Sequence, residues 1–195
     1  KKRLLKYFKD ISMKRMIVNK YGGPESLILE ECDSPIIKEL SVRIKVENVG
    51  VNFADTLVIR GRYQERPRPP FSPGLELSGT VIEVGKKVKT HEINDRVIGI
   101  AKYGSYCNEI VMPAENVYKI PNDMDFITAA SFPVAYGTAF GAIDWKGVLQ
   151  KNQTCLILGA AGGVGLACVE IANAYGANTI AAAGSDEKCE TCKEH

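Results

Sequence analysis

Histidine is scarce in this sequence, which has only two such residues, His91 and His195, in 195 positions. His91 lies next to a glutamate in an expected loop and His195 is the last residue given, so neither belongs to a cluster of metal ligands. Of the six cysteines, only Cys189 and Cys192 have ligand-like spacing, and no second pair accompanies them. Catalytic zinc requires several Cys, His or carboxylate ligands and an open position, so we expect no metal site.

A long apolar run is also missing. The longest stretch without a charged residue, 126–143, reaches 18 residues, near the lower limit of about 17–25 for a membrane-spanning helix. It contains Ser131, Pro133 and Thr138, which are poorly suited to lipid. We therefore expect two helices, at 125–132 and 134–148, broken at Pro133, and no membrane partner. We find no secretory signal sequence either.

The composition is ordinary for a globular protein, with 45% hydrophobic and 25% charged residues, which excludes extended disorder. The net charge of +2 conceals an asymmetry: residues 1–20 carry eight Lys or Arg and one Asp, so the rest of the chain has a charge of −5. We interpret residues 1–15 as a basic, solvated N-terminal arm, with a mitochondrial targeting remnant as the alternative. An acidic body has no basic groove, so a nucleic-acid partner is not expected.

The six cysteines lie mostly among apolar residues and form no disulfide framework, which indicates reduced thiols in a reducing compartment. We therefore expect a cytoplasmic location, with the mitochondrion as the alternative.

Residues 16–125 show the pattern of a β-rich domain. Apolar and polar residues alternate at 42–47, as in a half-buried strand, and short strands are expected at 80–85, 96–100 and 109–112. One helix interrupts them, with Asn52 as its N-cap and Gly61 at its end. Four prolines between 67 and 73 then predict a stiff loop.

Residues 126–195 change to a β-α-β pattern, with a strand at 154–158, a helix at 164–175 ending at Gly176, a strand at 179–183 and a helix from Asp186. The turn between the first strand and its helix is rich in glycine. Glycine there lets the backbone approach a pyrophosphate, and the helix N-terminus offers unpaired N–H groups. The candidate phosphate-binding residues are Ala160, Gly162, Gly163, Val164 and Gly165, with Ala160 standing where the usual pattern has its first glycine.

The end of the second strand indicates which dinucleotide is bound. An NAD site needs an acidic residue there for the ribose 2′-hydroxyl. This sequence has instead Gly184, Ser185 and Lys188, a small hydroxyl and a cation that suit a 2′-phosphate, so we expect NADPH. Asp186 is the counter-argument, but an acid in the first turn of the next helix complements the helix dipole.

Seven segments in order carry a resemblance to a known family. The chain resembles the zinc-free quinone oxidoreductase (zeta-crystallin-like) branch of the medium-chain dehydrogenase/reductase superfamily. The matching segments are 52–55 with 61–63, 73–81, 94–97, 113–116, 129–138, 159–165 and 184–188. The resemblance implies an α/β fold in which a GroES-like catalytic β-domain (residues 16–125) is followed by a doubly wound Rossmann domain, of which residues 126–195 supply the N-terminal part.

The resemblance also implies roles for individual residues. Asn52 and Asp55 would line the substrate side of a cleft, and Tyr63 matches the tyrosine that related enoyl reductases use beside the substrate. Tyr136 and Thr138 would lie near the nicotinamide. The structural alternatives are that Asn52 only caps its helix, that Asp55 pairs with a nearby arginine, and that Tyr63 packs in its loop. Zinc-dependent relatives carry Cys where this chain has Asn52.

The implied activity is NADPH-dependent, zinc-independent hydride transfer to a quinone or an α,β-unsaturated carbonyl. The alternatives are an enoyl-thioester reductase of the same superfamily and a non-catalytic protein that binds NADPH or RNA. The family further implies a homodimer for the full-length protein. Since a doubly wound sheet needs two mononucleotide-binding halves and this sequence supplies only one β-α-β unit, we expect the chain to be incomplete.

Overall fold

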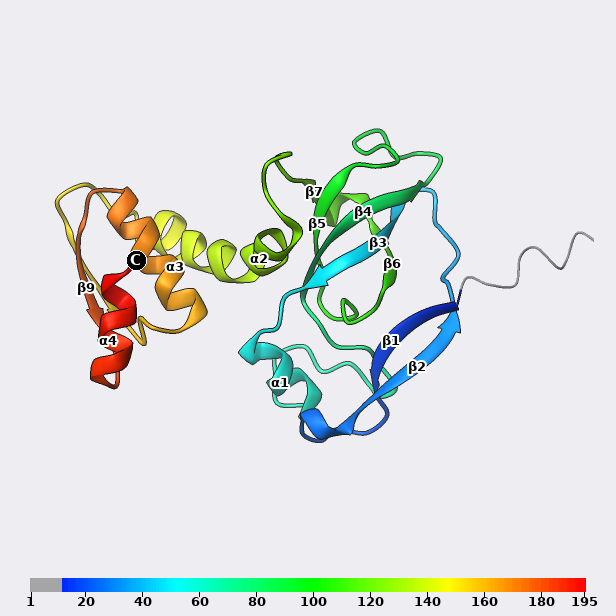
Figure 1. Cartoon of the computed structure of the whole chain (residues 1–195), viewed down its shortest axis with the longest axis horizontal. Coiled ribbons are helices and arrows are strands. Elements are labelled where there is room, and N and C mark those ends of the chain that lie inside the picture. Colours follow the sequence, from blue (N-terminus) through cyan, green and yellow to red (C-terminus); the bar gives the residue numbers. More distant parts are fainter. Residues whose placement is uncertain (1–11) are drawn as a thin grey trace, which may run out of the picture. The chain divides into compact units, whose positions relative to one another are not determined.

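The computed structural model describes residues 12–195, so residues 1–11 of the predicted arm lie outside the described part. The chain divides into two units, the first ending at Ser131 and the second beginning at Phe132. Figure 1 shows the strands of the first unit and the helices and short sheet of the second. The units are described separately below.

The first unit is built mainly of strands (Figure 1). They are β1 (Ser12–Val18), β2 (Leu27–Asp33), β3 (Ser41–Val49), β4 (Glu76–Val84), β5 (Arg96–Ile100), β6 (Glu109–Pro113) and β7 (Val117–Lys119). Its helical segments are η1 (Pro24–Ser26), α1 (Phe53–Ile59), η2 (Ala114–Asn116) and the beginning of α2 (Phe126–Phe140). The strands expected near 42–47, 80–85, 96–100 and 109–112 are confirmed, although β4 begins at Glu76, earlier than expected.

Five strands form one antiparallel sheet in the order β6-β3-β4-β5-β7. The alternation in β3 buries Val42 and Ile44, which pack with Leu77 and Val81 of β4 and Val97 of β5. On β3 between these apolar residues, Arg43 pairs with Glu83 of β4 and Glu109 of β6. The apolar face forms the core of the unit, and the ion pairs of Arg43 join β3 to both of its neighbours, β4 and β6.

The hairpin formed by β1 and β2 was not expected from the sequence. Its strands pair antiparallel over their full length, from Ser12 opposite Asp33 to Val18 opposite Leu27. The prediction of a solvated arm is therefore wrong for residues 12–15, because the basic residues Lys14 and Arg15 form ion pairs with Glu31 and Glu30 across the hairpin. Met13, Ile17 and Val18 of β1 are buried, so apolar packing holds the strand and the cross-strand ion pairs add to it.

The single α-helix within the β-rich region, α1, forms as the sequence predicts. Asn52 is its N-cap residue, and the Asp55 carboxylate accepts a hydrogen bond from the Asn52 N–H at 2.8 Å. Gly61 follows its end with φ of +65°, a conformation that favours glycine. Val58 and Ile59 of α1 pack with Val18 and Phe71 in a second, smaller apolar cluster.

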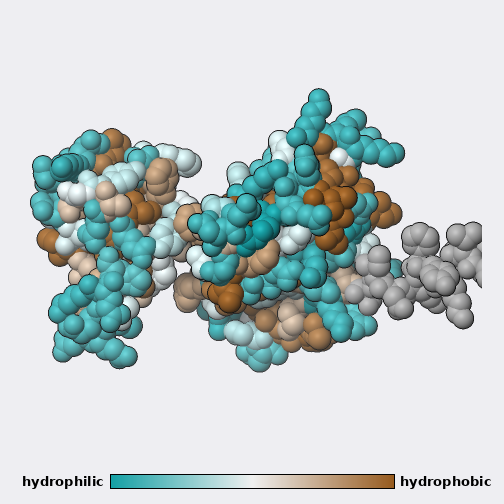
Figure 2. Space-filling model, turned by 45° about the horizontal axis from the view of Figure 1, so that its top comes forward, coloured by the Kyte–Doolittle hydropathy of each residue, from teal (hydrophilic) through white to brown (hydrophobic). Residues whose placement is uncertain are grey.

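The second unit contains the predicted β-α-β segment. Its elements are the end of α2 (Phe126–Phe140), the π-helical η3 (Gly141–Lys146), β8 (Thr154–Leu158), α3 (Gly163–Ala174), β9 (Asn178–Ala182) and α4 (Asp186–Lys193). β8 and β9 pair in parallel over all five positions. Ile157 of β8 packs against Val169 and Ala172 of α3. Leu156, Leu158 and Ile180 are exposed on the strands, and Figure 2 shows hydrophobic atoms at the surface of both units.

The predicted break at Pro133 is wrong. α2 continues through Pro133, and η3 extends the helical segment to Lys146. A proline inside a helix removes one hydrogen bond, at a cost of about 3 kcal/mol, and can kink a helix without ending it. In the preceding turn, Ala129 and Ala130 are buried.

The continuous segment Phe126–Lys146 is long and apolar enough to cross a membrane by length and composition, the one such helix among residues 12–195. A single helix of this kind does not by itself indicate a membrane-spanning segment, because core helices of globular proteins meet the same criteria.

The core of the five-stranded sheet provides a direct test of the fold. Leu77 is fully buried, so Leu77→Ala should lower the free energy of unfolding by about 2–5 kcal/mol through lost burial and a residual cavity. Leu40 is 64% exposed, and the matched variant Leu40→Ala should change stability by less than about 0.5 kcal/mol. Chemical denaturation of both variants measures this difference. Equal losses would contradict the placement of Leu77 in the core.

Candidate functional site

The glycine-rich turn joins the carboxyl end of β8 to the start of α3. Gly159, directly after β8, has φ of +67°, and Gly162 is the N-cap residue of α3. The Gly162 N–H donates to the Gly159 carbonyl oxygen at 3.1 Å, which closes the turn. The first N–H groups of α3 have no acceptor within the helix and carry its positive dipole end. This arrangement presents backbone donors to an anion.

The glycines of the turn differ in the space around them: Gly165 is closely packed, whereas Gly162 and Gly163 are exposed. A Cβ atom on Gly165 would lie 2.4 Å from the Gly159 oxygen and 2.7 Å from Ala160 Cα, so α3 approaches the turn too closely for a side chain. Gly162 and Gly163 are exposed, and a Cβ on Gly163 would meet no heavy atom within 4 Å. Open space therefore lies over the exposed backbone, where a ligand could approach, and Val164 beside it is partly exposed.

The turn is joined to the end of β9. The buried Ala160 donates its N–H to the Ala182 carbonyl oxygen at 3.0 Å, which places Ala160 in a structural role. Gly184 and Ser185 follow β9 and lead into α4. Since parallel strands end at the same edge, the structure brings the glycine turn and the 184–188 segment to one edge of the β8–β9 sheet.

Ser185 and Lys188 lie at the start of α4. Ser185 is the N-cap residue, and its Oγ accepts a hydrogen bond from the Lys188 N–H at 3.4 Å. The hydroxyl proton of Ser185 remains available for donation. Lys188 is exposed, and its ammonium group has no ion-pair partner among the residues that the structure describes. Asp186 occupies the first turn of α4, as the sequence predicts.

Tyr136 and Thr138 lie on α2, within the second unit. The Tyr136 hydroxyl donates a hydrogen bond to the Glu170 carboxylate of α3, and this interaction raises the pKa of Tyr136 and lowers the pKa of Glu170. The Tyr136 ring stacks on Phe132, with 4.7 Å between ring centroids. Thr138 is exposed. The structure therefore places the Tyr136 side chain against α3. It does not bring Thr138 to the glycine turn by a hydrogen bond.

A cluster of polar side chains surrounds the N-terminus of α1 in the first unit. The Asn52 amide nitrogen Nδ2 donates to Glu76 Oε1 at 2.7 Å, and the Tyr106 hydroxyl donates to Asp55 Oδ2 at 3.0 Å. Asp55 and Glu76 are 1% and 2% exposed. The structure thus brings together two of the three predicted catalytic residues, Asn52 and Asp55, but buries the Asp55 carboxylate.

Burial dominates the electrostatics of this cluster. It raises the pKa of Asp55, although the hydrogen bonds from Asn52 and Tyr106 act in the opposite direction. Asp55 Oδ1 is buried without a hydrogen bond. The pKa of Tyr106 is also raised, by burial first and then by the negative charges of Asp55 and Glu76. Asp55 therefore pairs with Tyr106 and not with an arginine.

Tyr63, the third predicted catalytic residue, lies in the loop after α1. It is partly buried and packs against the cluster of Val18, Val58, Ile59 and Phe71. Its backbone oxygen accepts a hydrogen bond from Arg66. This position supports loop packing as one role of the ring.

Two residues of the cluster, Glu76 and Tyr106, were not predicted as site residues. Glu76 is within the 73–81 segment that carries the resemblance, and an acidic residue in an otherwise apolar strand is a signal that could have identified it. Tyr106 has no comparable signal, because it reaches Asp55 from 51 positions along the chain.

No group of three or more His, Cys, Asp or Glu side chains suited to a metal ion occurs among residues 12–195. Cys192 is buried in the apolar cluster of the second unit, and all six cysteines are free thiols. His91 is buried, with its ring nitrogens near Thr90 Oγ1 and the Val117 carbonyl oxygen.

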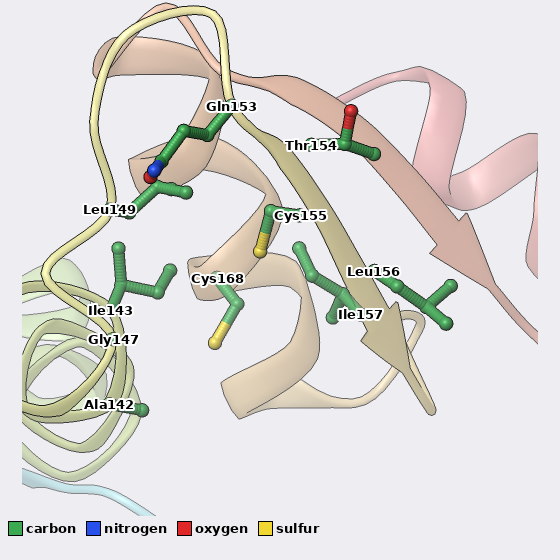
Figure 3. A pocket seen from close by; sticks show the side chains of 10 residues that line it. All are labelled: Ala142, Ile143, Gly147, Leu149, Gln153, Thr154, Cys155, Leu156, Ile157 and Cys168. Atoms are coloured by element: carbon green, nitrogen blue, oxygen red, sulfur yellow. The ribbon is translucent and has the colours of Figure 1, made fainter.

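A groove of about 680 Å³ lies beside β8 in the second unit. Figure 3 shows Cys155 and Ile157 of β8 on the side of Cys168 of α3, with Ile143 and Leu149 nearby, whereas Leu156 points away. None of the residues of the glycine turn lines this groove. This groove is therefore distinct from the candidate phosphate site.

Comparisons with known proteins identify the family of the chain. Residues 38–122 match the alcohol dehydrogenase GroES-like domain. Quinone oxidoreductase-like protein 2 of Rattus norvegicus is 42% identical over 167 residues, covering 85% of this chain and 48% of the rat protein. The chain belongs to the quinone oxidoreductase-like proteins of the medium-chain dehydrogenase/reductase superfamily. It spans about half the length of the curated relatives it matches.

Solved structures show the same fold. The human synaptic vesicle membrane protein VAT-1 homolog-like protein superposes with a TM-score of 0.89 at 32% identity, over 94% of this chain and 60% of that chain. Escherichia coli quinone oxidoreductase complexed with NADPH gives a TM-score of 0.88 at 28% identity, over 93% and 56%. The predicted combination of a GroES-like domain with a Rossmann-type β-α-β segment is confirmed.

The contrast between two glycines tests the geometry of the turn. Gly165→Ala should destabilise the protein by about 1–3 kcal/mol, because its Cβ would overlap the backbone of the turn. Gly163→Ala adds a methyl group in open space and should leave the free energy of unfolding unchanged or slightly higher. Thermal denaturation of both variants measures the difference. Equal stability would refute the close approach at Gly165.

The buried carboxylate of Asp55 gives a pH-dependent prediction. Since its folded-state pKa is raised above the ordinary value of 3.8, the native state binds this proton more tightly than the unfolded state. The contribution of Asp55 to stability therefore falls as the pH rises from about 3.8 through its folded-state pKa. Asp55→Asn retains an oxygen acceptor for both donors and removes this dependence.

The stability of Asp55→Asn relative to the unmodified protein should consequently increase with pH across that window. Denaturant unfolding at a series of pH values measures this difference. A relative stability that decreases with pH would show that the carboxylate is stabilised in its charged form.

Proposed function

We propose that this chain is the GroES-like domain and first nucleotide-binding half of an NADPH-dependent, zinc-independent oxidoreductase that transfers hydride to a quinone or an α,β-unsaturated carbonyl. The observation that carries the proposal is the glycine turn, with exposed backbone at Gly162 and Gly163 and α3 held against the turn at Gly165. The relatives support it, since the matched Escherichia coli quinone oxidoreductase was solved with NADPH.

The residues present fit a dinucleotide. The exposed N–H groups at the start of α3 would hold its pyrophosphate, and the open space over Gly163 would admit it. At the end of β9, the Ser185 hydroxyl and the exposed Lys188 ammonium would bind a phosphate on the adenosine ribose. No acidic side chain ends β9, since Ala182 and Ala183 are followed by Gly184. This combination favours NADPH over NADH.

A bound nicotinamide would supply the hydride, and the protein would need to orient the acceptor and stabilise the charge that develops on its oxygen. Asn52 offers an amide group whose orientation is set by Glu76. Tyr63 is a partly buried residue whose phenol would donate a hydrogen bond to a carbonyl oxygen. The carboxylates of Asp55 and Glu76 are engaged by Tyr106 and Asn52, a donor set that favours hydrogen bonding over metal binding.

The proposed partner is a small-molecule quinone or enone, and a homodimer is proposed for the complete protein. The proposed location is the cytoplasm, on the basis of six free thiols.

The experiment that tests the activity is turnover by the product of the complete open reading frame. Consumption of NADPH, followed by its absorbance, is measured with quinones, enones and trans-2-enoyl thioesters. The proposal predicts turnover of quinones or enones and a clear preference for NADPH over NADH. Preference for enoyl thioesters would reassign the substrate class, whereas preference for NADH would contradict the cofactor assignment.

The contribution of Lys188 to the coenzyme preference can be measured with a matched control. Lys188→Ala should weaken NADPH binding by roughly 1.5–3 kcal/mol, the range for a hydrogen bond to a charged group, and leave NADH binding unchanged. Lys193→Ala, on the same helix, removes a lysine that already pairs with Glu190 at 2.7 Å and should not alter either affinity. Fluorescence titration measures both. Parallel losses for NADPH and NADH would contradict a role in binding the 2′-phosphate.

A further inference from the structure

The orientation of the Asn52 amide is fixed by its partner. A side-chain amide has a donating nitrogen and an accepting oxygen, and an ionised carboxylate can only accept. Glu76 Oε1 lies 2.7 Å from Asn52 Nδ2. When Glu76 is ionised, it therefore excludes the flipped orientation, in which the Asn52 oxygen would face Glu76.

Glu76 is itself held in place. It is the first residue of β4, is only 2% exposed, and pairs with Ile100 in the ladder to β5. The end of β3 leaves room for the carboxylate, because a Cβ atom on Gly50 would lie 2.1 Å from Glu76 Oε1. The Gly50 N–H also donates to the Glu76 carbonyl oxygen at 3.3 Å. Both the backbone and the carboxylate of Glu76 are thus constrained by the sheet.

The same cluster constrains Asn52 from the other side. Its backbone N–H donates to Asp55 Oδ2, and that oxygen also accepts from the Tyr106 hydroxyl. The Asn52 backbone is therefore anchored through Asp55 and its side chain through Glu76. Asn52 thus donates hydrogen bonds to two buried carboxylates, whereas the N-cap of a seven-residue helix requires only the bond to Asp55.

We propose that Glu76 is a positioning residue that fixes the donor and acceptor ends of the Asn52 amide for the substrate. Glu76 presents the Asn52 carbonyl oxygen and the second N–H of Nδ2 away from the carboxylate. The proposal rests on the proposed function, because it assigns the Asn52 amide to substrate binding. A purely structural role, in which Glu76 only ties α1 to β4, predicts a different outcome when the polarity of the pair is reversed.

The donor and acceptor of the Asn52–Glu76 hydrogen bond can be exchanged by substitutions that leave the size of both side chains nearly unchanged. In the complete protein, Glu76→Gln makes both amide orientations of Asn52 possible, and Asn52→Asp alone places two carboxylates in contact. The double variant Asn52→Asp/Glu76→Gln restores one hydrogen bond with donor and acceptor exchanged. Glu83→Gln is the control, since it alters a glutamate on the same strand that pairs with Arg43, outside the cluster.

For Glu76→Gln we expect kcat to fall by about 10- to 100-fold, the scale of losses from misplaced substrate contacts, with NADPH affinity unchanged. The double variant should recover the thermal stability lost in Asn52→Asp but not the activity. Glu83→Gln should retain kcat. Wild-type kcat in the double variant would overturn the proposal, because either polarity would then serve the reaction.

A second readout does not depend on activity. The two side-chain amide protons of Asn52 give separate NMR signals. The proton that is hydrogen-bonded to Glu76 should exchange slowly with solvent in the wild type and faster in Glu76→Gln. Rapid exchange in the wild type would overturn the proposal. Slow exchange in a protein that turns over no quinone, enone or enoyl thioester would support the fixed amide and reject the proposed function, which separates the two failures.

Discussion

The close approach of α3 to the turn after β8 is the constraint on which the candidate cofactor site depends. Gly165 permits it, since a side chain there would overlap the Gly159 oxygen and the Ala160 backbone. The approach directs the N-terminus of α3 toward the edge at which β8 and β9 both end. The hydrogen bond from Ala160 to Ala182 then joins the turn to β9. Three glycines thus have two physical roles: Gly165 provides packing, and Gly162 and Gly163 provide an accessible backbone.

A second constraint operates around α1, in the first unit. Burying the carboxylates of Asp55 and Glu76 costs free energy unless hydrogen bonds offset it. Tyr106 and Asn52 provide these bonds, yet the pKa of Asp55 remains raised. Such a cluster is a costly way to begin a short helix. Polar groups kept buried at this cost are characteristic of sites whose geometry is used in function.

The fold was largely predictable from the sequence because its main signals are local. Alternation in β3, the glycines at 61 and 176 and the strand–turn–helix pattern near 159 each depend on a few neighbouring residues. The errors arose where distant or weak contributions decide the structure. Ion pairs across the β1–β2 hairpin stabilise a strand in a segment that is merely basic in sequence. α2 continues through Pro133, because a proline lowers the stability of a helix without always ending it, and the sequence does not show which of the two occurs.

The candidate site was predictable only in part. The turn residues were identified from spacing, and Asn52 and Asp55 from a resemblance, but the burial of Asp55 and its contact with Tyr106 depend on tertiary structure. Ser185 and Lys188 were identified from the sequence as candidate phosphate ligands, whereas the hydrogen bond by which Ser185 caps α4 is seen only in the structure.

The most direct test of the central claim is the response of individual backbone amides to the dinucleotide. In ¹⁵N-edited NMR spectra of the protein titrated with NADPH, the account predicts that the largest shifts occur at the amides of Gly162, Gly163, Val164 and Gly165, with a second group at Ser185. Shifts that are absent from this turn, or confined to the groove beside β8, would contradict the account.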